Sequence, residues 1–273
     1  MLTYPSINPI AFHIGNWPVY WYGLMYMVGF LGGWGVLALK LRFAPQNGNQ
    51  YTFTQNQLAD VIFYAALGAI IGGRLGYILF YDGQTIWSDP LFILQTWKGG
   101  MSFHGGLLGV LIAILFCKRK MQKPFLVITD LIACGVPIGL AAGRIGNFIN
   151  GELWGRVTTV PWGMVFPDAG PWPRHPSQLY EAGLEGLVLF IILFIYAWKP
   201  KPLGAVSGLF ALCYGLFRIA VECFREPDAP IGYVAFGWLT EGQLLSLPLV
   251  LVGIGLLVFA YCKESRKNHE TIS

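Results

Sequence analysis

Residues 179–201 read LYEAGLEGLVLFIILFIYAWKPK, an apolar run that carries two glutamates near its start and ends in two lysines. An apolar stretch of about 20 residues is long enough to cross a bilayer as a helix. The run from Leu179 to Trp198 has this length, and Lys199 and Lys201 follow it directly. The stretch therefore predicts a membrane-spanning helix with a basic end at one membrane surface.

Six further apolar runs of this kind predict an all-α integral membrane protein with about seven transmembrane helices. They cover residues 20–39, 58–80, 101–117, 125–142, 204–221 and 244–261. The composition agrees, because 12% of residues are charged and a soluble domain carries about 25%. We expect one polytopic membrane domain over residues 1–273, with a small periplasmic segment at about 147–177.

Basic residues predict the orientation of these helices. Most of the 18 Lys and Arg residues lie in clusters directly after the first, third, fifth and seventh runs. Loops rich in Lys and Arg stay in the cytoplasm, so the N-terminus is expected outside, in the periplasm, and the C-terminus in the cytoplasm. The first residues lack a basic start, so we expect the first span to act as an uncleaved anchor.

The basic residues on the opposite side are mostly arginines near bilayer depth. They are Arg74, Arg144, Arg156, Arg174, Arg218 and Arg225, with Lys98 as the seventh. An arginine in or beside the hydrocarbon region costs at least a few kcal/mol unless it is paired or solvated. Since the guanidinium fork matches phosphate oxygens, these residues indicate that the protein holds an anion, such as a lipid phosphate, at the outer surface.

Carboxylates near the arginines suggest partners for some of them. Arg218, Glu222 and Arg225 share one helix face by their spacing. Glu222 can neutralise only one of these arginines, so we expect Arg218 to keep unmatched positive charge and to bind the anion. Glu181 and Glu185 are also four residues apart, and we expect them to pair with some of the arginines.

His104 lies in the stretch GGMSFHGGL, residues 99–107, where glycines flank a break before a helix. Histidine titrates near neutral pH and suits the removal of a proton from a thiol or hydroxyl. The alternative is a histidine that only makes structural hydrogen bonds, and the residues alone leave both open.

The densest polar stretch is GRIGNFINGELWGR, residues 143–156, with two arginines, two asparagines, one carboxylate and four glycines. Arginine and asparagine donors suit phosphate binding, although a turn with solvated polar groups is the alternative. Farther along, Ser177 in RHPSQLYE, residues 174–181, is expected to cap the following helix.

The five cysteines are scattered without a CxxC pair, and no Asp/His cluster is evident. We therefore expect no disulfide, no metal, no cofactor and no cysteine nucleophile. The net charge of +4 is modest and does not indicate nucleic-acid binding.

Several motifs together resemble the prolipoprotein diacylglyceryl transferase family of bacteria, over about residues 10 to 260. They are Trp21-Tyr22-Gly23-Leu24, Gly72-Gly73-Arg74, His104-Gly105-Gly106-Leu107, residues 143–156, His175–Glu181 and Arg218…Glu222…Arg225-Glu226-Pro227-Asp228.

The resemblance implies an inner-membrane enzyme with its active site toward the periplasm. Such an enzyme moves the diacylglyceryl group of phosphatidylglycerol onto the lipobox cysteine of a preprolipoprotein, forms a thioether and releases glycerol phosphate, which is the first step of lipoprotein maturation. The implied partners are phosphatidylglycerol, lipobox signal peptides and membrane lipids, with no nucleic acid.

The resemblance also assigns roles to residues. His104, Arg144 and Arg218 are expected to be catalytic. The residues expected to bind phosphatidylglycerol are Tyr22, Arg74, Arg144, Asn147, Glu152, Gly155, Arg218, Glu222 and Arg225. Whether His104 takes the thiol proton or the arginine field alone lowers the thiol pKa stays open.

Two other classes remain as alternatives from the residues alone. A transporter for an anionic solute also uses buried arginines and broken helices, but it predicts two similar halves. Only two similar four-residue stretches, GRLG at 73–76 and GRIG at 143–146, suggest a repeat. A structural scaffold would leave the arginines without explanation.

Overall fold

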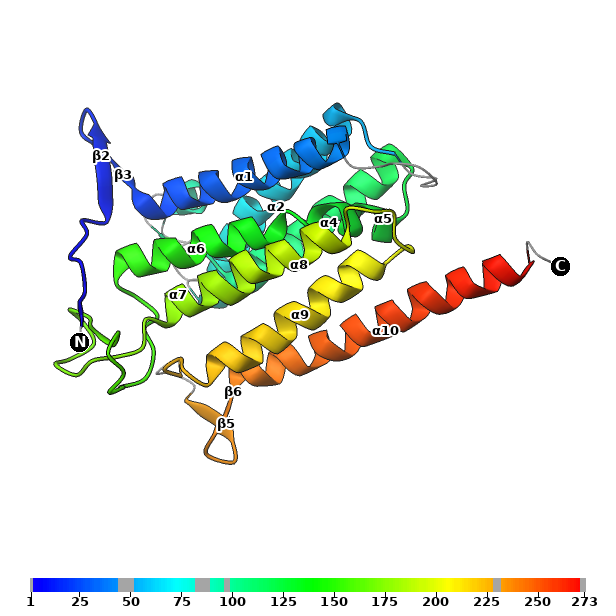
Figure 1. Ribbon diagram of the computed structural model, residues 1–273. Coiled ribbons are helices and arrows are strands. Elements are labelled where there is room, and N and C mark those ends of the chain that lie inside the picture. The colour runs from blue at the N-terminus through cyan, green and yellow to red at the C-terminus, as the bar shows by residue number, and fades with distance from the viewer. Residues whose placement is uncertain (1, 44–51, 82–88, 96–98, 228–231, 271–273) are drawn as a thin grey trace. The chain divides into compact units, whose positions relative to one another are not determined.

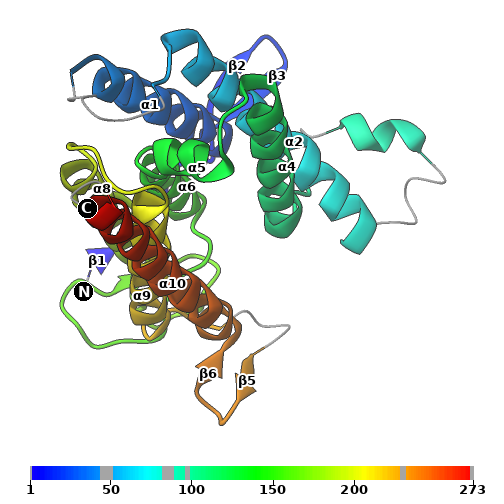
Figure 2. The same cartoon turned by 90° about the vertical axis from the view of Figure 1, so that its right-hand side faces the viewer.

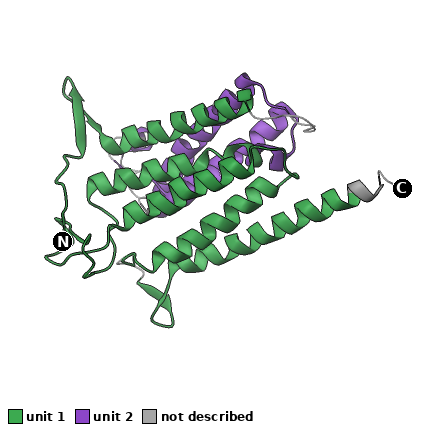
Figure 3. Ribbon diagram, in the orientation of Figure 1, with its two compact units in different colours: residues 1–47, 130–273 green, residues 48–129 purple. Residues whose placement is uncertain are grey.

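The computed structural model describes residues 2–43, 52–81, 89–95, 99–227 and 232–270, and its contacts form two compact units (Figure 3). Unit 1 comprises residues 1–47 and 130–273, and unit 2 comprises residues 48–129. The boundary falls within helix α5 (Phe125–Ala133). Lys98 and Asp228, which the sequence motifs include, lie outside the described residues.

Unit 1 is mostly helical, as expected, with short strands near the helix ends. Besides part of α5, its helices are α1 (Trp21–Phe43), α6 (Val136–Asn150), α7 (Ser177–Glu181), the π-helix η3 (Ala182–Val188), α8 (Leu189–Tyr196), α9 (Ala205–Glu222) and α10 (Glu241–Glu270). Its strands are β1 (Leu2–Thr3), β2 (Ile10–Ile14), β3 (Trp17–Tyr20), β4 (Met164–Val165), β5 (Tyr233–Ala235) and β6 (Leu239–Thr240). β1 pairs with β4 in parallel, whereas β2–β3 and β5–β6 are antiparallel hairpins.

The helices of unit 1 run up and down side by side. α1, α8 and α10 end on the same side of the unit, and α6 and α9 run in the opposite direction (Figure 1). The hydroxyls of Tyr196 and Tyr261 are 2.7 Å apart and join the end of α8 to the second half of α10. The basic residues in the last turn of α1, after α8 and near the end of α10 therefore lie at one end, which agrees with the pattern read from the sequence.

The start of α9 is fixed by a carboxylate from another helix. Asp130 of α5 accepts hydrogen bonds from the backbone N–H groups of Gly204 and Ser207, both at 2.7 Å. These N–H groups have no partner inside the helix, so Asp130 acts as a cap supplied across the unit. From this start α9 follows α10 along its length (Figure 2), and Gly208, Gly215 and Gly253 lie at the contact.

Unit 2 is built on one close pair of helices, α2 (Gln55–Tyr81) and α4 (Phe103–Met121), with a short 3-10 helix η1 (Pro90–Leu94) between them in sequence. Glycines at every fourth position of α2 face glycines of α4, as small residues do at close helix contacts in membranes. They are Gly68, Gly72 and Gly76 on α2 and Gly105 and Gly109 on α4.

Five described helical segments are long and apolar enough to cross a membrane. They are α1, α2, residues 177–196, α9 and α10, and the pair α5 and α6 makes a sixth if it is counted as one span. That pair bends by 50°, because the helix breaks at Cys134 and Gly135 and restarts with Pro137 in its first turn. The sequence predicted one span at residues 125–142, which the bent pair matches if it is counted as one span, but the bend itself was not predicted.

Replacing Gly109 by alanine should destabilise unit 2. A Cβ at this position would lie 2.8 Å from the carbonyl carbon of Gly68 and closer still to its oxygen. Overpacking of this kind costs about 1–3 kcal/mol, which lowers the melting temperature by about 3–10 °C. The melting temperature of the purified protein in detergent, followed by circular dichroism, measures this.

Gly106→Ala is the matched control on the same helix. Its nearest neighbour, the oxygen of Ala69, would lie 3.4 Å from the new Cβ, so the melting temperature should stay unchanged or rise with the better helix propensity of alanine. Equal losses in both variants would contradict the close packing of α2 on α4.

Candidate functional site

Two arginines of unit 1 converge on one buried carboxylate. The Nε of Arg144 on α6 lies 2.6 Å from Oε2 of Glu181, and the Nη1 of Arg218 on α9 lies 3.1 Å from the same oxygen. The side chain of Glu181 is fully buried. Three segments that are far apart in sequence thus place two guanidinium groups within reach of a single atom.

Arg218 has two further carboxylate partners. Its Nη2 lies 2.8 Å from Oε2 of Glu222, one turn later on α9, and its Nη1 lies 3.6 Å from Oε1 of Glu185. The expectation that Glu181 and Glu185 pair with arginines is confirmed. The expectation that Arg218 keeps unmatched charge is wrong, because it counted only the carboxylate on the face of α9, and two more come from α7 and η3.

Local backbone features bring these carboxylates together. The helix that carries Glu181 and Glu185 widens into a π-helix directly after Glu181, and such segments are common at functional sites. Gly186 lets this segment approach α6, since a Cβ there would lie 2.9 Å from the Cα of Ala141. Gly242, at the start of α10, makes room for the Glu222 carboxylate, because a Cβ there would lie 2.7 Å from the Cδ of Glu222.

A polar chain continues from Arg144 toward the end of α6. The Nη1 of Arg144 donates to Oδ1 of Asn147 at 3.4 Å, and Nδ2 of Asn147 donates to Oε1 of Glu152 at 2.9 Å. Asn150 also donates to this Glu152 oxygen, at 3.2 Å. The predicted run ended at residue 142, before Arg144, but α6 continues to Asn150, so Arg144 lies within the helix.

The turn after α6 is tightly held by neighbouring segments. Leu153 has a positive φ of 59°, a conformation that non-glycine residues adopt at a cost. The hydroxyl of Ser177 donates to the carbonyl of Leu153 at 2.9 Å. Ser177 was expected to cap α7, yet Pro176 occupies the cap position and Ser177 lies in the first turn, so this prediction is wrong.

Gly155 lies where three segments meet. Its N–H donates to the carbonyl of His175 at 2.8 Å, and a Cβ would lie 2.5 Å from the carbonyl oxygen of Phe224. Gly155 also faces Arg225 across an isolated β-bridge. The structure therefore gives Gly155 a packing reason to be glycine, and Arg225, which is buried, lies beside it.

Tyr22 of α1 lies against α6, the helix that carries Arg144. A Cβ on Gly146 would lie 2.9 Å from Cδ2 of the Tyr22 ring, so the glycine makes room for it. The Tyr22 ring also meets Tyr26 edge to face, with centroids 5.2 Å apart. Tyr22, Arg144, Asn147, Glu152, Gly155, Arg218, Glu222 and Arg225 all belong to unit 1.

Arg74 belongs to unit 2 and is buried among backbone carbonyls. Its Nη1 donates to the carbonyls of Gly99 and Gly100 at 2.6 and 3.1 Å, and its Nε donates to Ile93 at 3.3 Å. Its Nη2 donates to the carbonyl of Phe92, whose ring also lies under the guanidinium carbon at 4.3 Å. Most donors of Arg74 therefore hold the segment that leads to α4.

His104 also belongs to unit 2 and lies in the first turn of α4. Ser102 caps this helix, with its Oγ accepting from the N–H of Gly105 at 3.3 Å. The imidazole is exposed, and its ring meets Phe103 edge to face at 5.7 Å. The expectation that His104 enters a helix from a glycine-flanked break is confirmed.

Tyr4 helps to hold the end of α6, a role that the sequence analysis did not predict. Its hydroxyl donates toward the carbonyls of Phe148 and Ile149 at 2.6 and 2.8 Å, at the C-terminal end of α6. Burial raises the pKa of this hydroxyl above its usual range. A single tyrosine before a proline carries no pattern from which this contact can be predicted.

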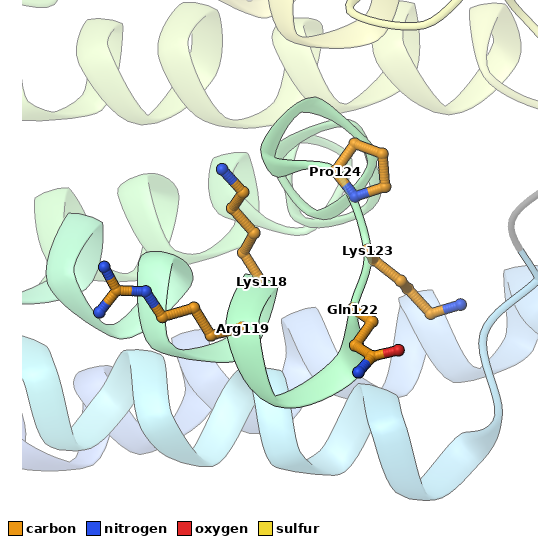
Figure 4. Close-up of a pocket in the computed structure, with 5 residues that line it drawn as sticks. All are labelled: Lys118, Arg119, Gln122, Lys123 and Pro124. Atoms are coloured by element: carbon orange, nitrogen blue, oxygen red, sulfur yellow. The ribbon is translucent and has the colours of Figure 1, made fainter.

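Basic residues in the last turn of α4 and directly after it border an open hollow. An open hollow of about 380 Å³ is lined by Lys118, Arg119, Gln122, Lys123 and Pro124. Figure 4 shows Lys118, Arg119 and Lys123 pointing in different directions. This divergence fits residues that set topology at a membrane surface.

The family model described as prolipoprotein diacylglyceryl transferase matches residues 9–259 of this chain. The chain belongs to this family. It is 56% identical over 266 residues to the phosphatidylglycerol–prolipoprotein diacylglyceryl transferase of Coxiella burnetii, covering 97% of this chain and 100% of that protein. It is 54% identical to the protein of the same name from Pseudomonas aeruginosa, covering 97% of this chain and 98% of that protein. The resemblance read from the motifs is thereby confirmed.

Replacing Arg74 by lysine tests its role in holding the segment before α4. Lysine keeps the charge but replaces the fork by a single ammonium, so several hydrogen bonds to carbonyls are lost at about 1.5–3 kcal/mol each. Amide hydrogen exchange at Phe92 and Gln95, whose N–H groups close η1, should become at least about tenfold faster.

Arg119→Lys, an exposed arginine of the same unit, serves as the control and should leave these exchange rates unchanged. Unaltered exchange in Arg74→Lys would show that the carbonyl contacts do not hold this segment.

Proposed function

We propose that this protein transfers the diacylglyceryl group of phosphatidylglycerol to the lipobox cysteine of preprolipoproteins. The cysteine sulfur forms a bond to the terminal glyceryl carbon, and the bond between that carbon and the phosphate oxygen breaks. Glycerol phosphate leaves with the electron pair, and the thiol proton passes to a base or to solvent. The products are a thioether-linked lipoprotein precursor and glycerol phosphate.

The observation that carries this proposal is the convergence of Arg144 and Arg218 on one buried point of unit 1. Guanidinium groups stabilise the charge that develops on a departing phosphate when they are fixed before the reaction. The printed names of the relatives supply the substrates, phosphatidylglycerol and a prolipoprotein, and favour a transferase over a transporter.

The chemistry requires no nucleophile from the enzyme, since the substrate provides the thiol. A free thiol has a pKa of about 8.5 and attacks as the thiolate. His104, exposed at the start of α4, is the proposed proton acceptor. The alternative is that the positive field of the arginines promotes ionisation of the thiol without a base.

The other binding roles are assigned by the groups that each residue contacts. We assign Arg144 and Arg218 to the phosphate, Asn147 and Glu152 to the polar chain beside it, and Tyr22 to the wall formed by α1. Glu222 and Arg225 complete the charged end of α9. Arg74 and Gly155 act through the segments they hold, because their contacts in the structure are with protein backbone.

Membrane placement is part of the proposal. With α4 counted beside the six spans and the basic helix ends in the cytoplasm, the chain crosses the bacterial inner membrane seven times. The N-terminus, the segment at about 147–177 and the active site then lie toward the periplasm. Support comes from the shared direction of the basic ends in unit 1 (Figure 1) and from the positive-inside rule.

Incubation of the purified protein with phosphatidylglycerol and a lipobox peptide tests the activity directly. We expect the peptide to gain the mass of one diacylglyceryl group, with equimolar release of glycerol phosphate. A peptide with serine in place of the cysteine is the control and should gain none, because the alcohol is a far weaker acid and nucleophile than the thiol. An unmodified cysteine peptide would refute the transferase.

Replacing His104 by asparagine and by glutamine tests the proton acceptor. Loss of a general base costs about 10²–10⁴-fold in rate, and the remaining rate should rise with pH toward the pKa of the free thiol. His13→Gln, at an exposed histidine of β2, is the control and should match the wild type. Wild-type turnover in both His104 variants would leave the arginine field as the activating element.

A further inference from the structure

We infer that Glu181 is the positioning residue of the phosphate site and sets the direction in which Arg144 presents its donors. The inference rests on the proposed function, because it assumes that Arg144 binds the phosphate of phosphatidylglycerol.

The geometry distinguishes the two arginines. Glu181 holds Arg144 through Nε at 2.6 Å, on the side of the guanidinium. A guanidinium carries five N–H donors in a rigid fork, and this ion pair holds it at the Nε side and leaves the Nη1 and Nη2 end for a second acceptor. Only the 3.4 Å bond from Nη1 to Asn147 uses that end among the described contacts.

Arg218 is held differently. Its Nη1 faces Glu181 and Glu185, and its Nη2 faces Glu222. The fork of Arg218 is therefore occupied by carboxylates, and the side chain is only 11% exposed, compared with 21% for Arg144. Arg144 is the better placed of the two for a bidentate contact with phosphate oxygens, and Arg218 fixes the carboxylate that aims it.

Burial makes Glu181 a rigid support. It is fully buried and lies at the last residue of α7, where the helix widens into η3. A buried carboxylate shared by two arginines cannot swing away without leaving charges unpaired, which is strongly unfavourable. Arg144 is consequently held in place before the lipid arrives, which is the condition for transition-state stabilisation.

Glu181→Gln in the full-length protein tests the inference, with phosphatidylglycerol and the lipobox peptide as substrates. The amide keeps the shape but loses the charge that fixes Arg144. We expect kcat to fall by about 10²-fold, the scale of a displacement of about 1 Å. KM for phosphatidylglycerol should not rise, because a negative charge has been removed from beside the phosphate.

A double-mutant cycle shows whether Glu181 acts through Arg144. Arg144→Lys lacks the Nε donor, so adding Glu181→Gln to it should change kcat by less than about twofold. Glu185→Gln is the matched control, because Glu185 is equally buried and contacts Arg218 but has no recorded ion pair with Arg144 among the described residues. Its effect should multiply with that of Arg144→Lys.

Glu181→Asp is a second variant that tests the inference if the glutamine variant does not fold. It keeps the charge and withdraws it by one methylene, so it should lower kcat in the same direction while the melting temperature stays closer to that of the wild type. Wild-type kcat in either variant, a raised KM with unchanged kcat, or multiplicative effects of Glu181→Gln and Arg144→Lys would overturn the inference. An inactive wild type would refute the proposed function instead.

Discussion

The structure of unit 1 depends on the way in which buried guanidinium groups are paired within a bundle of apolar helices. Removing an arginine from water costs several kcal/mol, and an ion pair offsets this only when the geometry is good and the remaining donors are used. Glu181 supplies the ion pair for Arg144 and Arg218 together. The approach of α6, α7 and α9 is therefore a condition for placing these charges at all, and the glycines at Gly186 and Gly242 are the local means of meeting it.

The charge balance of the cluster has a consequence for ligand binding. Arg144 and Arg218 meet Glu181, Glu185 and Glu222, so in this cluster three carboxylates face two arginines. An anionic ligand cannot rely on excess positive charge in such a place. It must be held by directed hydrogen bonds from donors that the carboxylates leave unoccupied. Binding of the anion therefore depends on how one guanidinium is oriented more than on the summed positive field of several arginines.

The sequence was sufficient to predict the helical membrane class, the approximate positions of six of the seven spans and the pairing of Glu181 with arginine. The run at 101–117 forms α4, which is not among the candidate spans of the described residues. Apolar length and basic flanks are local features, and each is readable from one stretch of chain. The partners of Arg218 were predicted incompletely, because a helix-face argument counts only neighbours at i and i+4, and Glu181 and Glu185 come from another helix. The bend between α5 and α6 and the π-helix at Ala182–Val188 were missed because no periodic signal marks them.

The arginines near the membrane surface have two structural roles. The roles differ in the groups that the arginines contact. Arg74 and Arg156 donate to the backbone carbonyls of Gly99 and Arg225 and so hold loop segments. Arg174 does both, because it donates to the carbonyl of Ala169 and also pairs with Glu226 at 3.2 Å. Arg144 and Arg218 instead meet carboxylates inside the bundle. A carbonyl partner leaves the positive charge uncompensated but occupies the donors, whereas a carboxylate on Nε compensates the charge and leaves the fork open. Binding a phosphate in a directed way needs the second arrangement, and among these residues Arg144 shows it most clearly.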